Sequence, residues 1–148
     1  QKFKGLNYRQ QIVYKNSNLT IINDSKSTSF SSSIGILKTN PNIYWLLGGI
    51  YKKGDKFKLP KRYCKNIKAF IFGKKRTFFN NQLKGKVTVE NFHNLNDAFK
   101  KVLTLTKKQK SVKKIILFSP SAASFDSFSN FEERGLYFNK LIKKYLNG

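Results

Sequence analysis

The sequence predicts an α/β fold: a Rossmann-like, mostly parallel sheet with helices on both faces and an antiparallel edge strand. Two observations predict it. Short apolar runs bounded by Gly, Pro or Asn alternate along the chain with amphipathic helical patterns, as in proteins built from strand-helix-strand units. Several of these runs are apolar at every position, which indicates strands buried on both faces of a parallel sheet. The 148 residues are enough for one domain.

The first elements are predicted to be a pair of short strands and a helix. Residues 10–14 and 19–23 alternate or run apolar on either side of an Asn-Ser-Asn turn, which predicts an antiparallel pair. A helix is predicted to begin at residues 24–26, where Asp and Ser are favoured caps, and to end at the Asn-Pro of residues 40–41. Its apolar side chains recur at helical spacing: Phe30, Ile34 and Leu37.

The middle of the chain is predicted to hold three strands and one weak helix. Residues 43–47 and 67–72 are apolar runs of strand length, and each is followed by glycine. A weak helical pattern covers residues 77–83, and residues 87–90 are predicted to form a short strand.

The last elements are predicted to be two amphipathic helices around one strand. Asn94 is a favoured cap, with Asp97 in the first turn of the helix that follows and a lysine-rich exit at residues 107–110. The apolar face of this helix is formed by Leu95, Ala98, Phe99, Val102 and Leu103. Residues 113–118 are predicted to form a strand, and residues from about 130 to 146 the final helix.

The strong positive charge of the chain raises the hypothesis of nucleic-acid binding. The net charge is +23 and the isoelectric point is near 10.2. Only four of the 30 basic residues are arginines, whose planar fork serves most direct base contacts, and the lysines are spread over nearly all polar segments. This pattern is typical of an A/T-rich codon composition expressed on solvated faces. A basic nucleic-acid-binding module is the alternative function.

Several kinds of site are missing from the sequence. The single cysteine, Cys64, cannot form an internal disulfide, and with the single histidine, His93, it cannot make the usual zinc site. The chain contains no phosphate loop of the G-x-x-x-x-G-K-[ST] type and no histidine-assisted Ser or Cys nucleophile with an orienting acid. No apolar run reaches about 18 residues, so we expect no membrane-spanning helix. The sequence does not look like a complete catalyst, and a stand-alone domain that binds a small anion is a further alternative.

The candidate functional residues follow three of the predicted strands. Residues 24–28, 48–52 and 119–124 come after apolar runs, and in a doubly wound sheet such strand ends share one edge. The segment 119–135 is rich in small residues and hydroxyls before a helix, which favours binding of an anion. Four of the seven acidic residues lie in these motifs: Asp24, Asp126, Glu132 and Glu133. We therefore expect the three loops to converge on one ligand.

In their order along the chain, these segments resemble the C-terminal domain of the Mur ligase family. The resemblance rests on Asn-Asp-Ser-Lys-Ser-Thr at residues 23–28, Leu-Leu-Gly-Gly at 46–49 with Lys52 beyond, and the long segment 117–135. Residues 5–9, Gly-Leu-Asn-Tyr-Arg, are similar to the hinge from the family's central domain. The match covers essentially the whole chain, and the last segment is similar to that of the members that add D-glutamate.

The resemblance implies that residues 1–8 are a hinge from a missing central domain and that residues 9–148 are the C-terminal, D-glutamate-binding domain. The chain has no methionine, and we accordingly expect it to be a piece of a larger protein. The whole protein would be an ATP-dependent ligase that adds D-glutamate to UDP-N-acetylmuramoyl-L-alanine in cytoplasmic peptidoglycan synthesis. ATP and Mg²⁺ would be bound mainly by the central domain. The C-terminal domain would close over ATP, be inactive alone and be a monomer.

The resemblance also assigns site residues, position by position. One carboxylate of D-glutamate would be held by Thr28 and Lys52. The other carboxylate would be held by Ser124, Phe125 and Phe131. The nucleotide would be contacted by Arg9, Asp24 and Lys26, with Asp24 at the ribose. No residue of this domain would be catalytic or would bind a metal.

Two positions depart from the family pattern. Tyr8 stands beside Arg9 where the family usually has His, and Ser29 follows Thr28 where the family usually has Asn. Both departures fall beside the expected nucleotide contacts.

Overall fold

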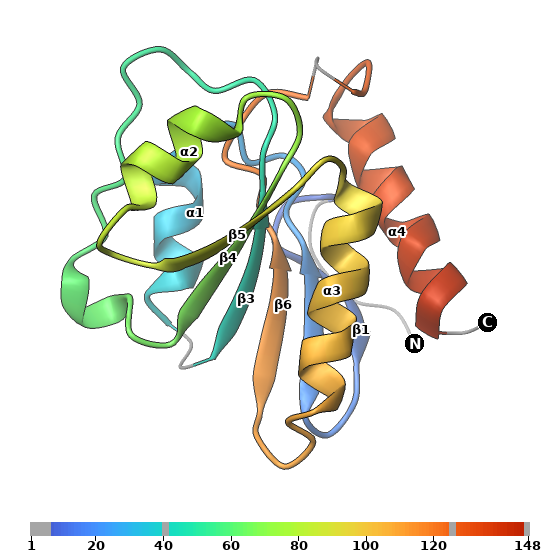
Figure 1. Ribbon diagram of the computed structural model, residues 1–148. Helices are drawn as coiled ribbons and strands as arrows, with labels where there is room; N and C mark the ends of the chain where they lie inside the picture. Colours follow the sequence, from blue (N-terminus) through green and yellow to red (C-terminus); the bar gives the residue numbers. More distant parts are fainter. Residues whose placement is uncertain (1–6, 40–41, 125–126, 147–148) are drawn as a thin grey trace.

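The structure, a computed structural model, describes residues 7–39, 42–124 and 127–146. The described strands form a six-stranded sheet in the order β1-β2-β6-β3-β4-β5 (Figure 1). Their bounds are β1 Gln11–Lys15, β2 Leu19–Asn23, β3 Ile43–Leu47, β4 Ile67–Phe72, β5 Thr88–Phe92 and β6 Lys114–Phe118. β1 pairs with β2 antiparallel, and the other pairings are parallel. The predicted mostly parallel sheet with an antiparallel edge strand is confirmed.

The described helices cover both faces of this sheet. They are α1 Phe30–Leu37, α2 Arg76–Leu83, α3 Leu95–Lys107 and α4 Phe131–Leu146, with a short 3-10 turn, η1, at Lys61–Tyr63. α1 and α2 lie on one face, and α3 and α4 lie on the other (Figure 1). None of these helices is long and apolar enough to cross a membrane.

Both faces of the central strands are buried, as the continuous apolar runs predicted. On β3, Trp45 faces the α1 side and packs against Phe30, with ring centroids 6.3 Å apart. The next residue, Leu46, faces the opposite side and belongs to the apolar cluster that contains Phe99 of α3 and Phe138 of α4. Alternate side chains of one strand therefore fill two separate layers of the core.

The predicted strand bounds agree closely with the structure. β2, β3 and β4 have the bounds that were predicted, and β1 and β6 each begin one residue later. β5 extends two residues beyond its prediction, because its pairing with β4 continues to Phe92 opposite Phe72. The η1 turn was not predicted, and α2 begins one residue earlier than expected.

The first helix begins at Phe30, so the prediction that it begins at Asp24 was wrong. The carboxyl group of Asp24 does not cap a helix, because it accepts hydrogen bonds from the backbone N–H of Gln10 and from the hydroxyl of Ser119. The amino end of α1 is instead bound by Asp55, whose Oδ2 accepts a hydrogen bond from Phe30 N at 2.9 Å. The start of α1 is also fixed locally, because Ser29 is the N-cap and forms a capping box with Ser32, whose hydroxyl accepts a hydrogen bond from Ser29 N at 3.3 Å.

The register of the sheet brings three strand ends to one level. β6 lies between β2 and β3, and Phe118 at its end pairs with Asn23 of β2 and with Leu46 of β3. The segments that follow these strands therefore start side by side. We call residues 24–28 the first loop, residues 48–52 the second loop and residues 119–124 the third loop.

Candidate functional site

The three loops contact one another at the carboxyl edge of the sheet. Gly48 N donates a hydrogen bond to Pro120 O at 3.1 Å, and Ile50 and Ala123 form an antiparallel bridge with two hydrogen bonds of 2.9 Å. These contacts join the second loop to the third. The first and third loops are joined because Ser121 N donates to the hydroxyl of Ser27 at 3.2 Å. The part of the prediction that brings the three loops together at one edge is confirmed, and their binding of one ligand stays a prediction.

A cluster of buried serine hydroxyls lies beneath these loops. Ser33 of α1 is its centre, with its Oγ 2.9 Å from that of Ser27 and 2.7 Å from that of Ser121. A further short hydrogen bond joins Ser33 to the hydroxyl of Ser119. All four serines are buried. The cluster therefore ties α1 to the first and third loops through groups that satisfy one another.

Asp24 connects this cluster to the incoming chain. Its side chain is only 3% exposed; Oδ1 accepts a hydrogen bond from Gln10 N at 3.0 Å and Oδ2 accepts one from Ser119 Oγ at 2.7 Å. Burial raises the pKa of the Asp24 carboxyl, an effect opposed by the two hydrogen bonds and by the charges of Arg9 and Arg134. The predicted ribose contact is thus a buried carboxyl at the base of the site.

The other residues predicted to contact the nucleotide lie where the chain enters the domain. Arg9 is exposed and is close enough to Asp24 to lower the pKa of its carboxyl. Lys26 N donates a hydrogen bond to Tyr8 O at 2.9 Å. The Lys26 ammonium lies 5.2 Å from the ring centroid of Phe131. Groups assigned to the nucleotide and to D-glutamate therefore lie together at the start of α4.

The residues predicted to hold D-glutamate surround the same edge. Thr28 and Lys52 are exposed at the ends of the first and second loops. Asp55 links the segment that carries Lys52 to the segment that carries Thr28. Its backbone N–H donates a hydrogen bond to Lys52 O at 3.0 Å, and its carboxylate accepts one from the N–H of Phe30, two residues after Thr28. Ser124 ends the third loop and is buried.

Two aromatic residues complete the predicted D-glutamate set. Phe131 is half-buried at the first position of α4. Its carbonyl oxygen accepts a hydrogen bond of 2.7 Å from the hydroxyl of Ser25, in the first loop. Phe125 lies outside the described residues.

Strained backbone is concentrated at this edge. Among the described residues, the non-glycine residues with positive φ are Tyr8, Gln10 and Ser121, at 64°, 46° and 59°. All three lie in the incoming chain or the third loop. Non-glycine residues in this region of φ and ψ persist only where surrounding contacts hold them, and they cluster at functional sites. The strain therefore supports a functional role for this edge.

Three residues of the site were not predicted to have these roles. Ser33, Asp55 and Arg134 each join segments that are far apart in the sequence. A sequence signal exists for Ser33 and Arg134, because each is a polar residue on the buried side of an amphipathic helix. Asp55 gives no such signal, since a carboxylate in a lysine-rich loop is typical of solvent-exposed chain.

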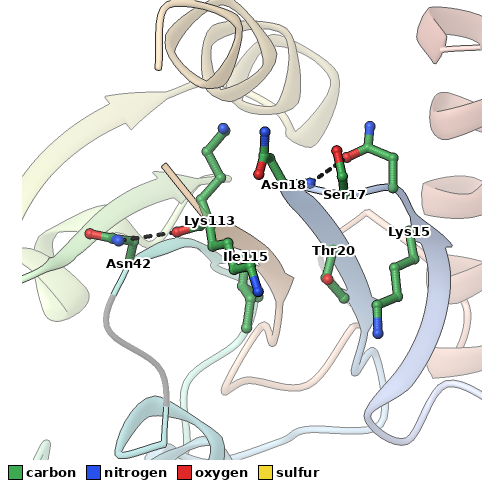
Figure 2. Close-up of a pocket in the computed structure, with 9 residues that line it drawn as sticks. Lys15, Ser17, Asn18, Thr20, Asn42, Lys113 and Ile115 are labelled. Carbon is green, nitrogen blue, oxygen red and sulfur yellow. Dashed lines mark hydrogen bonds between the residues drawn. The ribbon is translucent and has the colours of Figure 1, made fainter. Parts of the chain in front are cut away.

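A separate cavity of about 290 Å³ lies at the opposite, amino-terminal edge of the sheet. Figure 2 shows Lys15 and Thr20 on one side of it and Asn42, Lys113 and Ile115 on the other. No carboxylate is among its described lining residues. This lysine-lined cavity is remote from the three loops, because it adjoins the starts of β2 and β6.

Comparison with known proteins identifies relatives over nearly the whole chain. No protein-family model matches the chain. The UDP-N-acetylmuramoylalanine–D-glutamate ligase of Wolbachia sp. subsp. Brugia malayi (strain TRS) is 37% identical over 144 residues, 97% of this chain and 29% of that protein. The ligase of the same name from Francisella philomiragia is 38% identical over 146 residues, 96% of this chain and 34% of that protein. The one from Rickettsia prowazekii is 36% identical over 143 residues, 97% of this chain and 32% of that protein.

The chain thus spans about a third of the length of the curated relatives it matches. The matched part has the size of a single domain. By this similarity, which covers 96–97% of its length, the chain belongs to the Mur ligase family.

Proposed function

We propose that the chain is the C-terminal, D-glutamate-binding domain of an ATP-dependent ligase that adds D-glutamate to UDP-N-acetylmuramoyl-L-alanine in peptidoglycan synthesis. The observation that carries the proposal is the convergence of the first, second and third loops at one sheet edge. The names of the relatives supply the reaction and the amino acid. In this proposal, residues 1–8 are the hinge from a central domain and residues 9–148 the substrate-presenting domain, which works as a cytoplasmic monomer.

The proposed role of the loops is to fix a dianionic amino acid by both of its carboxylates. Lys52 and Thr28 hold one carboxylate, and the Ser124, Phe125 and Phe131 region holds the other. The bridge between Ile50 and Ala123 supports this division, because it sets the spacing between the second and third loops, which carry Lys52 and Ser124. Two separated anion sites orient the amine, and orientation is a large source of rate for a ligase.

The proposed reaction needs a nucleotide beside this pocket. The substrate carboxylate takes a phosphoryl group from ATP, the D-glutamate amine attacks the resulting acyl phosphate, and phosphate leaves as the amide forms. Arg9, Asp24 and Lys26 form the nucleotide side of the pocket, at the point where the chain enters from the central domain. Arg9 and Lys26 offer exposed charges, and the carboxyl of Asp24 is buried. ATP and Mg²⁺ are bound mainly by that central domain, which makes this domain inactive alone. Within the described residues, no three metal-ligating side chains gather.

The test is a lysine substitution in the full-length protein. Lys52→Ala removes the proposed carboxylate partner, and we expect the KM for D-glutamate to rise at least about 30-fold. That factor corresponds to about 2 kcal/mol, the lower end of the cost of removing one partner of a desolvated charge pair. Lys53→Ala is the matched control, since Lys53 is the adjacent exposed lysine. Near wild-type D-glutamate kinetics in folded Lys52→Ala protein would refute the proposed site.

A further inference from the structure

We infer that Arg134 is the positioning residue of this site, a buried guanidinium from α4 that binds the first and third loops and lies beside the second. The inference rests on the proposed function, since it concerns how the D-glutamate pocket keeps its shape. Arg134 is only 1% exposed, whereas arginine side chains are mostly exposed in proteins. A buried cation in the first turns of α4 therefore calls for a specific role.

The guanidinium binds the first loop at several points. Its Nε donates a hydrogen bond to the hydroxyl of Ser25 at 3.1 Å, and its Nη2 donates to the carbonyl oxygen of Ser25. Nη2 also lies 3.4 Å from the carbonyl oxygen of Ser27. One face of the guanidinium fork thus fixes the backbone immediately before Thr28.

The same side chain reaches the other two loops. Its Nη1 donates to the carbonyl oxygen of Ala122, in the third loop, at 2.9 Å. The second loop approaches at Gly49, where an added Cβ would lie 3.4 Å from Nη1 and 2.4 Å from Ala123 O. The added Cβ would be in ordinary van der Waals contact with the guanidinium, and its clash with Ala123 O would push the second loop away from the third. Arg134 is therefore the point where the three loops meet.

These contacts lie next to the residues proposed to bind D-glutamate. Ser27 precedes Thr28, and Ala122 is two residues before Ser124. The hydroxyl of Ser25 accepts from Arg134 and donates to Phe131 O at 2.7 Å, so the start of α4 joins the same network. The fixed fork of arginine carries five donors in one plane, and a lysine ammonium cannot direct hydrogen bonds to these separated acceptors. Arg134 acts on D-glutamate through the loops, without touching it.

The experiment compares Arg134→Lys with the wild type in the full-length ligase. We expect the KM for D-glutamate to rise at least tenfold in the variant. The KM for UDP-N-acetylmuramoyl-L-alanine should change less than twofold, since that substrate contacts other domains in the proposed function. Arg62→Lys is the control, because Arg62 is exposed on η1, and both KM values should then stay at the wild-type level.

Ser25→Ala is the second variant, because it removes one acceptor of the guanidinium and leaves the buried cation bound to backbone carbonyl oxygens. We expect the KM of this variant for D-glutamate to rise about three- to tenfold. The midpoint of its thermal unfolding is measured in parallel. If the Arg134→Lys protein does not fold, the Ser25→Ala variant alone tests the role of Arg134. Added ethylguanidinium should partly restore the D-glutamate KM of Arg134→Ala protein, which a general loss of stability would not predict.

The possible outcomes separate the two proposals. One outcome overturns only the role of Arg134: the wild type turns over D-glutamate, and the D-glutamate KM is unchanged in folded Arg134→Lys or in Ser25→Ala protein. An equal rise in the KM of both substrates also overturns it, since that result indicates a general structural defect. A wild-type full-length protein without D-glutamate-dependent turnover overturns the proposed function and the role of Arg134 with it.

Discussion

The hydroxyl of Ser119 donates a hydrogen bond of 2.7 Å to Oδ2 of Asp24, which joins the ends of β6 and β2 beneath the candidate site. Oδ1 of the same carboxyl accepts from Gln10 N, so the incoming chain is held at this point as well. Because burial is the largest effect on this group and raises its pKa, the joint between these segments is sensitive to pH.

We expect the contribution of Asp24 to stability to decrease as the pH rises. A raised pKa means that the folded protein binds this proton more tightly than the unfolded chain, whose value is near 3.8. The free energy of unfolding that is due to Asp24 is therefore largest at or below that value and decreases as the pH passes the higher folded pKa. Urea unfolding of wild-type and Asp24→Asn protein between about pH 4 and pH 7 measures this. A wild-type advantage over the variant that increases with pH would contradict the expectation.

Gly49→Ala should destabilise the protein strongly. Gly49 has φ of +131°, a region that is essentially restricted to glycine, and an added Cβ would lie 2.4 Å from Ala123 O. We expect a loss of more than about 3 kcal/mol in the free energy of unfolding, from strain and from separation of the second and third loops. Gly54→Ala is the control: its φ is +83° but no atom lies within 4 Å of the added Cβ. Its cost should be about 1–2 kcal/mol. Similar losses in the two variants, measured by urea unfolding, would show that the close approach has no special importance.

Ser33→Ala should loosen the joint between α1 and the loops. The hydroxyl of Ser33 contacts three other buried hydroxyls, and its removal leaves those groups with fewer partners in a region closed to water. We expect a loss of about 1–3 kcal/mol in the free energy of unfolding. Ser31→Ala on the same helix should change it by less than about 0.5 kcal/mol, because Ser31 is exposed. Equal stability of the two variants would mean that the serine cluster does not tie α1 to the loops.

The sequence predicted the sheet and the meeting of the loops because both follow from local pattern. Continuous apolar runs such as β3 and β4 are typical of buried parallel strands, and parallel strands end at a common edge. The start of α1 was predicted wrongly because Asp24 is a favoured cap residue in isolation. Its partner Ser119 lies 95 positions away. Local preference lost to that tertiary contact, as helix propensities often do.

The role of Arg134 depends on contacts that no local pattern describes. The guanidinium binds Ser25, 109 positions earlier in the chain. Its place on the buried side of an amphipathic helix is a signal of burial, but that signal does not say which groups the guanidinium binds. Several residues assigned by family resemblance, such as Thr28 and Lys52, are exposed on the loops. The buried groups that hold those loops had to be found in the structure.

The lysine-lined cavity of Figure 2 is where the alternative function, nucleic-acid binding, can be tested. We expect duplex DNA to bind weakly, with a Kd no tighter than about 1 μM near physiological salt, which is the range of non-specific contacts to phosphate. The described residues that line the cavity include lysines but no arginine. Lysines attract phosphate by their charge, but they do not form the bidentate hydrogen bonds by which arginine recognises bases. Fluorescence anisotropy at about 50 mM and 200 mM salt measures this, and a lysine-rich protein of equal net charge is the control. Affinity well above the control, reduced by Lys15→Ala together with Lys113→Ala, would favour the nucleic-acid function instead. With affinity equal to the control, the charge of +23 reflects composition and gives no evidence of a nucleic-acid partner.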